Sequence, residues 1–578
     1  MTKKLLFILF ISFGFVAKAQ IPPQDISAPI SVFPNEKVSL SINSSFLLAG
    51  ELLQYKTYNL DAANKGSKLS KIVYVSLRNE NDSVVFSHKL KVENSIANAD
   101  FFIPSTLKTG IYRLIGYTNF SRNNKQDSFF QKNIYIVNTF VKTNEVPKAT
   151  ETVEVNFKTI KPSIISEKKN NEDQIKITSN KTNYGFREKV MLNIEDTFGK
   201  VSDNFTLSVR KMDPIEISGT ISDNASAISN GLFYIPELRG ELISGVVLSN
   251  GDGVSAANKT VSLTISGKNF IFKIAKTNAN GRFFFSVTEG YNTEKSIIQL
   301  NEPSEETSRY AIIMDSKYFP IGKTISSNLK LNSNIKDWLQ ERGLQLQVEN
   351  AYFDVKKDSI LNNKVNPTFY NNLGTVFLLD DYTRFPTVKE TFVEVVTLAA
   401  VRGSGTNSKF IVNNEYDPNK IAKFNDIPPL VLMDGIQIIN NEDLINYNAR
   451  EIESIRVVAQ PYRYGSKIYS GIIAVETKKG NFTPAASNSY VETINLRSTV
   501  KQKDYYNTNY SEKSSLSRIP DYRVQLFWQP NILLSSKSFK TSFFTSDVRG
   551  TYKIHLEGFT DQGSFISVEE YFNVSEKQ

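Results

Sequence analysis

Few residues in this chain have the types and the spacing that chemistry requires. The two histidines, His88 and His555, lie in distant segments, and neither has a second histidine or a cysteine at zinc-ligand spacing. We therefore expect both to be ordinary strand or surface residues. The chain contains no cysteine, which excludes disulfides, thiolate metal sites and a lipid-modified cysteine after a leader.

Two short glycine-rich segments could also carry chemistry, but their spacing argues against it. Gly403-Ser404-Gly405 lacks the G-x-S-x-G spacing of a nucleophile elbow. Asn250-Gly251-Asp252-Gly253 could offer oxygen ligands to calcium, yet the ligand pattern of a calcium loop is absent. Both segments are expected to be turns. The sequence therefore predicts no catalytic, cofactor-binding or metal-binding residues, and no enzyme.

A tyrosine cluster is the best candidate for an interaction loop. Tyr462, Tyr464 and Tyr469 lie close to Gly465 and Gly471. Tyrosine is favoured at interfaces because its rigid apolar ring ends in a polar hydroxyl. The alternative is that these rings pack the end of a sheet.

The segment around this cluster predicts a compact α/β unit. Asp434-Gly435 predicts a type I′ hairpin turn. Strands are expected at 430–434, 436–439, 452–458 and 471–477, with a helix at 441–447 capped by Asn440 or Asn441. In the strand at 452–458, Ile455 and Val457 should be buried.

The stretch from Pro429 to Gly480 resembles the plug domain of TonB-dependent outer-membrane receptors, in which Asp-Gly marks a structural hairpin tip. In those receptors a barrel follows the plug. Here 98 residues follow Gly480 (578 − 480), fewer than half of what a large barrel needs at about 10 residues per strand plus turns. The resemblance therefore implies a plug-like module without a channel of its own.

Most of the remaining chain alternates short β-branched and aromatic runs with turn residues, which is typical of β-sandwich modules. The turn at 45–51 and the strand at 109–118 resemble the macroglobulin-like (MG2) domain of bacterial alpha-macroglobulin relatives. Ala49 and Gly116 replace the proline and alanine that are frequent there. The turn is repeated at 183–190, and the Gly-x-Tyr strand is echoed at 549–560.

A further module, from Leu242 to about Ser316, resembles carboxypeptidase-regulatory-like domains, which carry no peptidase residues despite their name. The resemblance rests on Gly245 near the opening strand and on Gly281 in a hairpin turn. Two segments, 337–343 and 380–400, favour helices. In the second, Thr387 and Glu390 have the spacing of a capping box, and its apolar face is expected to pack on a core.

The expected fold class is mainly β, with tandem immunoglobulin-like or macroglobulin-like sandwiches and one small α/β plug-like domain. This combination resembles secreted proteins of the Bacteroidota type. The expected order is a signal peptide (1–19), a macroglobulin-like sandwich (20–140), a linker (141–171), a second macroglobulin-like unit (172–238), a carboxypeptidase-regulatory-like sandwich (239–325), a connecting region with helices (326–425), the plug-like domain (426–482), a polar linker (483–517) and a C-terminal β-sandwich unit (518–578).

The first residues predict export from the cytoplasm. Lys3 and Lys4, the apolar run 5–16 and Ala17-Lys18-Ala19 form a secretory signal peptide, with cleavage before Gln20. The apolar run is shorter than the roughly 20 residues that span a membrane, and no second long run follows, so no transmembrane segment is expected. We expect a protein of the periplasm, the outer membrane or the cell surface.

Cleavage of the leader lowers the formal charge from +9 to +6, because three lysines are removed. The basic residues are scattered among acids, which argues against a nucleic-acid partner.

Three functions are compatible with the features of this sequence. The first is a non-enzymatic scaffold or adaptor that binds an outer-membrane protein or a surface polymer. The second is an accessory of nutrient uptake through a separate TonB-dependent channel. The third is a protease inhibitor of the macroglobulin type, although the Cys-Gly-Glu-Gln thioester motif is absent.

Overall fold

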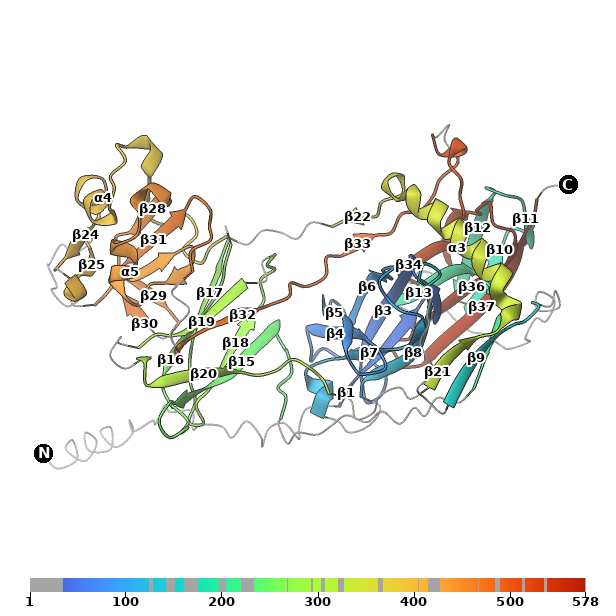
Figure 1. Ribbon diagram of the computed structural model, residues 1–578, viewed down its shortest axis with the longest axis horizontal. Coiled ribbons are helices and arrows are strands. Elements are labelled where there is room, and N and C mark those ends of the chain that lie inside the picture. The colour runs from blue at the N-terminus through green and yellow to red at the C-terminus, as the bar shows by residue number, and fades with distance from the viewer. Residues whose placement is uncertain are drawn as a thin grey trace, which may run out of the picture. The chain divides into compact units, whose positions relative to one another are not determined.

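The computed structural model describes residues 35–123, 128–141, 151–160, 175–196, 204–219, 233–267, 269–292, 295–302, 307–320, 327–361, 367–403, 405–413, 427–465, 467–483, 489–511, 515–534 and 538–576. The expected signal peptide lies outside these residues. The predicted fold class, mainly β with tandem sandwiches and one small α/β unit, is confirmed (Figure 1).

The first sandwich packs a three-stranded sheet on a five-stranded sheet. Its strands are β1 (Glu36–Ile42), β2 (Phe46–Leu48), β3 (Leu52–Asp61), β4 (Ile72–Arg78), β5 (Val84–Lys91), β6 (Ile96–Phe102), β7 (Gly110–Tyr117) and β8 (Phe130–Val137). The sheet orders are β1-β3-β6 and β2-β8-β7-β4-β5. Strand β4 is apolar on both faces because both are covered: Val75 points into the sandwich core, whereas Tyr74 packs in a second cluster with Phe319.

The second sandwich, which we call the split sandwich, is assembled from two segments that are far apart in sequence. One segment supplies β10 (Ile175–Ser179), β11 (Asn183–Tyr184), β12 (Lys189–Asp196) and β13 (Asn204–Lys211), and the other supplies β34 (Gln525–Leu533), β35 (Ser538–Phe544), β36 (Gly550–Phe559) and β37 (Phe565–Val574). The sheet orders are β10-β12-β35 and β11-β37-β36-β13-β34. The teal strands of the first segment therefore lie beside the red strands of the second (Figure 1).

This arrangement corrects the prediction of two separate units at 172–238 and 518–578. Strand β13 pairs with β34 on one side and with β36 on the other, so that Val209 lies opposite both Phe527 and Ile554. Each segment supplies only part of each sheet, and a few strands with one apolar face are not stable without the strands and the core that cover them. The two segments therefore share one core.

The first and the split sandwich have the same topology. If β1 to β8 are replaced in chain order by β10 to β13 and β34 to β37, both sheet orders are reproduced. The chain between β13 and β34 thus occupies the position of the short β4–β5 connection of the first sandwich. The third sandwich and the α/β unit are therefore inserted into one hairpin of the split sandwich.

The repeated motifs have the same local geometry in both sandwiches. The hydroxyls of Tyr112 and Tyr552 each donate to the backbone carbonyl four residues earlier, both at 2.8 Å, which is the geometry of a tyrosine corner. In the repeated turn, the carboxylate of Glu51 accepts from the Leu48 N–H at 3.1 Å, and that of Glu188 accepts from the Gly185 N–H at 2.7 Å.

The third sandwich is the first sandwich within the insertion. Its strands are β15 (Glu241–Ser249), β16 (Thr260–Ile265), β17 (Ile271–Lys276), β18 (Arg282–Val287), β19 (Lys295–Leu300), β20 (Tyr310–Met314) and β32 (Val491–Asn495). The sheet orders are β18-β15-β20 and β17-β16-β19-β32. Strand β32 comes from the segment that was expected to be a polar linker, and its pairing with β19 orders this segment.

The α/β unit follows within the insertion. Its elements are β23 (Thr375–Leu378), α4 (Val388–Glu394), β24 (Ala399–Arg402), β25 (Lys409–Val412), β26 (Leu430–Met433), β27 (Ile436–Gln437), α5 (Asn441–Ile445), β28 (Ile452–Val458), β29 (Tyr462–Tyr464), β30 (Lys467–Tyr469) and β31 (Ile472–Thr477). The main sheet has the order β23-β28-β31-β26-β27. The four predicted strands and the helix capped by Asn440 are present, although β27 ends at Gln437 and α5 at Ile445, each two residues before the predicted end. Ile455 and Val457 are fully buried, as expected.

The α/β unit begins earlier than the predicted residue 426, because β23, α4 and the β24–β25 hairpin contribute to its core. The predicted capping box between Thr387 and Glu390 is confirmed, although α4 ends at Glu394, before the expected residue 400. Phe392, Val395 and Val396 all pack into the core as expected.

A small sheet joins residues of the expected linker, of the expected second macroglobulin-like unit and of the expected connecting region, and the helix predicted at 337–343 is confirmed but longer. Strands β9 (Glu151–Phe157), β14 (Ile215–Ser218) and β21 (Ser327–Leu331) form a sheet in the order β14-β9-β21. Helix α3 (Lys336–Ala351) follows, and Leu339 packs in one cluster with Phe46 and Val155. A short pair, β22 (Ser359–Ile360) and β33 (Lys503–Asp504), lies farther along the chain.

Candidate functional site

The tyrosines of the predicted interaction loop contact other parts of the chain. Tyr464 donates a hydrogen bond to the carbonyl of Phe272 in the third sandwich, and its ring lies 4.3 Å from the ring of Phe369 between centroids. Tyr462 donates to the Phe369 carbonyl at 3.1 Å, and Tyr469 is buried in the same aromatic cluster. These contacts match the alternative interpretation, in which the rings pack a sheet end, rather than a free interaction loop.

The two glycines of this loop differ in their surroundings. Gly465 is exposed and has a φ of +58°, which favours glycine at the tip of the β29–β30 hairpin. Gly471 is buried, and a Cβ at this position would lie 2.4 Å from the Val458 carbonyl oxygen. Gly471 therefore permits a close approach of two backbones.

Asp434 and Gly435 form the predicted hairpin tip between β26 and β27, with φ values of +49° and +82°. The Asp434 carboxylate is buried and accepts hydrogen bonds from the N–H and the hydroxyl of Thr477 at 2.8 and 2.6 Å. The Gly435 carbonyl accepts from the Thr264 hydroxyl at 3.0 Å. The turn is structural, and it contacts the third sandwich.

The two histidines lie in separate environments. Nδ1 of His88 is 2.7 Å from the Tyr55 hydroxyl, and burial lowers the pKa of His88 to about 4. Nε2 of His555 is 2.9 Å from the Ser567 hydroxyl, and burial lowers its pKa as well. Within the described residues, no group of three or more acidic or histidine side chains is arranged to hold a metal ion.

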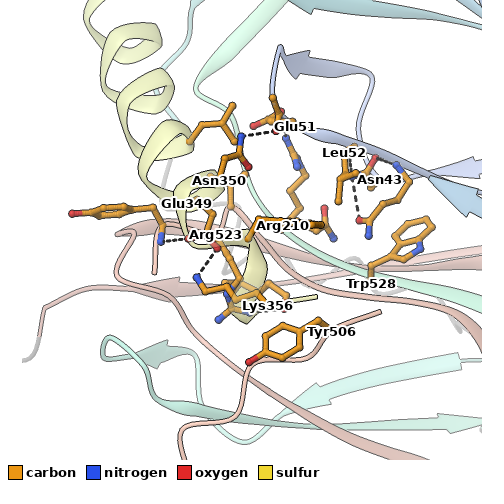
Figure 2. A pocket seen from close by; sticks show the side chains of 18 of the residues that line it. Asn43, Glu51, Leu52, Arg210, Glu349, Asn350, Lys356, Tyr506, Arg523 and Trp528 are labelled. Carbon is orange, nitrogen blue, oxygen red and sulfur yellow. Dashed lines mark hydrogen bonds and ion pairs between the residues drawn. The ribbon is translucent and has the colours of Figure 1, made fainter. Parts of the chain in front are cut away.

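A cavity of about 190 Å³, which we call the junction cavity, brings together several ionisable side chains. It lies where helix α3 meets the Gly50–Glu51 turn of the first sandwich and strand β34 of the split sandwich. Figure 2 shows Glu349, Asn350 and Lys356 approaching from the helix side, with Arg210, Arg523 and Trp528 beside them.

The first group of charges, the Glu51 cluster, consists of Glu51, Arg210, Asp213 and Arg342. Arg342 on α3 donates to both carboxylate oxygens of Glu51, at 2.8 and 2.9 Å, and to Asp213 at 2.6 Å. Arg210 on β13 contacts Glu51 at 3.2 Å. Burial alone would raise the pKa of Glu51, but the charges of Arg342 and Arg210 outweigh burial and lower it.

The second group, the Asp521 cluster, consists of Glu349, Lys356, Asp521 and Arg523. Arg523 lies 2.6 Å from the fully buried Asp521 carboxylate, and Lys356 lies 2.6 Å from Glu349 and 3.6 Å from Asp521. Burial would raise the pKa of Asp521, but the Arg523 and Lys356 charges lower it to about 2. Glu349 also accepts from the Tyr522 N–H at 2.9 Å, so that the cluster connects α3 with the chain entering β34.

The sequence did not reveal this site because its residues come from five segments without a shared motif. Only Glu51 had a local signal, as the acidic residue of the repeated turn. The arrangement leaves each charge of the two clusters with an opposite charge beside it. Such clusters hold elements together, and they do not offer an unpaired general base or nucleophile.

Among the residues that the structure describes, no helix has the length and the apolar character needed to cross a membrane.

No protein-family model and no curated protein sequence matches the chain. Among solved structures, the chain is similar to trypsin-activated alpha-2-macroglobulin from Escherichia coli, with 9% identity, a TM-score of 0.24 and coverage of 94% of this chain and 42% of that chain. The native conformation of the E. coli protein gives 9% identity and a TM-score of 0.24, with coverage of 94% and 40%. Salmonella alpha-2-macroglobulin reacted with methylamine gives 8% identity and the same TM-score and coverage. This chain thus spans less than half of the length of these proteins, and their activity is not carried over to it.

Proposed function

We propose that this protein is a non-enzymatic scaffold or adaptor of the bacterial cell envelope, which binds an outer-membrane protein. The observation that carries the proposal is the pairing of charges around the junction cavity. Glu51 of the first sandwich contacts both Arg210 on β13 and Arg342 on α3. Buried ionisable groups are used there to hold elements together, which is what a scaffold requires.

The α/β unit supplies the surface for a partner. Strand β23 is an edge strand of its sheet. Strand β27 at the other edge contacts the third sandwich, because its Gln437 carbonyl accepts from the Gln299 side chain at 2.7 Å. Val376 and Leu378 on β23 are 38% and 50% exposed. An exposed apolar edge strand is a surface to which another chain can add.

Site-specific photo-crosslinking in the native bacterium tests the proposal. A photoreactive amino acid at Leu378 should capture one envelope protein reproducibly. The same probe at Leu533 of the split sandwich, which is 62% exposed, is the matched control and should not capture that protein. Capture of no envelope protein from Leu378, or equal capture from both positions, would contradict the proposal.

The two other functions inferred from the sequence stay predictions. Stabilisation of the purified protein by glycans or siderophores would favour the uptake accessory. Cleavage of the protein by an added protease, followed by retention of that protease, would favour the inhibitor. The predicted location in the envelope rests on the leader, which lies outside the described residues.

A further inference from the structure

A second cavity, which we call the lysine cavity, lies beside the junction cavity and shares Asn43 and Arg210 with it. Its volume is about 330 Å³, which is within the range of cavities that hold small molecules. Its wall combines Lys132 of the first sandwich with Lys211, Lys553 and His555 of the split sandwich.

The charges that line the lysine cavity do not balance. Four lysine and arginine side chains line it, namely Lys132, Arg210, Lys211 and Lys553, but only two carboxylates do, namely Asp213 and Glu557. Both carboxylates already have positive neighbours: Asp213 lies 2.6 Å from Arg342, and the charge of Glu557 acts on the buried Lys56. The wall therefore has an excess of positive charge.

Two of the four cations have acidic partners outside the cavity. Arg210 contacts Glu51 at 3.2 Å, and Lys553 contacts Glu569 at 3.0 Å. Lys132 and Lys211, in contrast, have no ion pair within the described part of the chain. Burial lowers the pKa of the half-buried Lys211, and the neighbouring charges of Arg342 and Arg549 lower it further, against the opposing effect of Asp213 and Glu341.

Arg210 supplies a second, independent observation. Its side chain is 10% exposed, and one of its terminal nitrogens contacts Glu51. Its Nε–H, however, is buried and has no acceptor among the described residues. A buried donor without an acceptor costs free energy, and it adds to the unbalanced polarity beside this cavity.

We propose that the lysine cavity binds a small anion that carries two negative charges, as a phosphate or a dicarboxylate does. Two lysines that form no ion pair among the described residues attract such a group, and Arg210, which lines the cavity and is held in place by Glu51, adds a further positive charge. The junction cavity supports this assignment by contrast. There, each charged side chain of the two clusters has an oppositely charged side chain of the protein beside it, whereas two lysines of the lysine cavity form no ion pair among the described residues. The inference is independent of the adaptor function.

The test uses the chain from Gln20 to its last residue, as expected after signal-peptide cleavage. The two probes are inorganic phosphate and succinate. Binding is measured by calorimetry at constant ionic strength, with chloride as the replaced anion. We expect at least one probe to bind, and Lys211→Gln to weaken that binding by roughly tenfold, since one charge close to the ligand is lost. Lys330→Gln is the control, because Lys330 is an exposed lysine paired with Glu154, and it should leave binding unchanged.

The two probes distinguish the sources of the negative charge. Tighter binding of phosphate identifies a phosphate-bearing ligand, and tighter binding of succinate identifies a dicarboxylate. Absence of binding of both probes to the unmodified protein overturns the proposal, as does equal binding by Lys211→Gln. If Lys211→Gln does not fold, Lys132→Gln replaces it, because Lys132 is exposed and its loss should leave the fold intact while weakening binding.

Discussion

Glu51 illustrates how a single side chain connects elements that are distant in sequence. It belongs to the turn before β3, yet it contacts Arg210 on β13 and Arg342 on α3. Its carboxylate is almost completely buried and has both oxygens in contact with arginine. Replacing a buried ion pair with apolar groups can be harmless, but removing one partner leaves an uncompensated charge.

We therefore expect Arg342→Met to destabilise the protein by about 3–5 kcal/mol, because Glu51 and Asp213 lose their main partner. Chemical unfolding followed by fluorescence measures the loss. Lys330→Met removes an exposed pair with Glu154 and should change stability little. Equal effects of the two substitutions would show that the Glu51 cluster does not stabilise the fold.

Asp521 predicts a specific pH dependence. The Arg523 and Lys356 charges lower its pKa in the folded protein to about 2, from an ordinary value of 3.8. A lowered folded-state pKa means that the stabilisation is complete above the unfolded pKa and is lost as the pH falls toward 2. The loss should amount to about 2 kcal/mol between roughly pH 4 and pH 2.

Unfolding free energies measured across this pH range check the prediction. Asp521→Asn should be less stable than the parent at neutral pH, because Arg523 stays buried without its partner. The difference between the two proteins should shrink as the pH falls toward 2. A difference that stays constant with pH would rule out this role of Asp521.

Gly435 combines a positive φ with a close contact, and the two effects can be separated. A Cβ at this position would lie 2.2 Å from the Phe270 ring. We expect Gly435→Ala to cost about 1–3 kcal/mol, because the ring or the turn must shift. Gly480→Ala shares the positive φ but meets nothing within 4 Å, so it measures the backbone strain alone. If both variants melt at the same temperature, the close contact with Phe270 does not contribute to the loss of stability.

At the scale of elements, strand β28 is the centre of the α/β unit. It pairs with β23 on one side and with β31 on the other, and its alternation places Ile455 and Val457 in the core while Arg456 stays partly exposed. A charge on the buried face of this strand cannot find a partner.

Ile455→Asp should therefore unfold the α/β unit, at a cost of several kcal/mol. Limited proteolysis should then cut within residues 427–477, which we expect to be protected in the parent. Glu453→Lys changes the charge at an exposed position of the same strand and should leave the digestion pattern unchanged. An Ile455→Asp protein as resistant as its parent would contradict the assignment of this core.

At the scale of the whole molecule, the split sandwich makes the segments before and after the insertion depend on each other for folding. Phe205, Leu207 and Val209 on β13 are fully buried, and they are covered by residues of the last four strands. The first sandwich, by contrast, takes all of its strands from residues 36–137.

A chain that ends before residue 525 should lose the split sandwich but keep the first sandwich, because only the former needs the missing strands. Hydrogen exchange read by mass spectrometry should show fast exchange at 175–211 and retained protection at 36–137. Retained protection at 175–211 would mean that this segment folds without β34 to β37.

The sequence by itself determined the features that depend on neighbours within a few residues. The alternation in 452–458, the Asp434-Gly435 turn, the Thr387–Glu390 capping box and the Gly-x-Tyr strands are such features, because strand period, positive φ and capping are set by local geometry. The mainly β class follows from the same local patterns. The tertiary structure alone decided that 175–211 and 525–574 form one sandwich, that the tyrosines near 464 face the third sandwich, and that Glu51 meets Arg342. These contacts join residues that are far apart in the chain, and their energies depend on burial and on distances that exist only after the chain has folded.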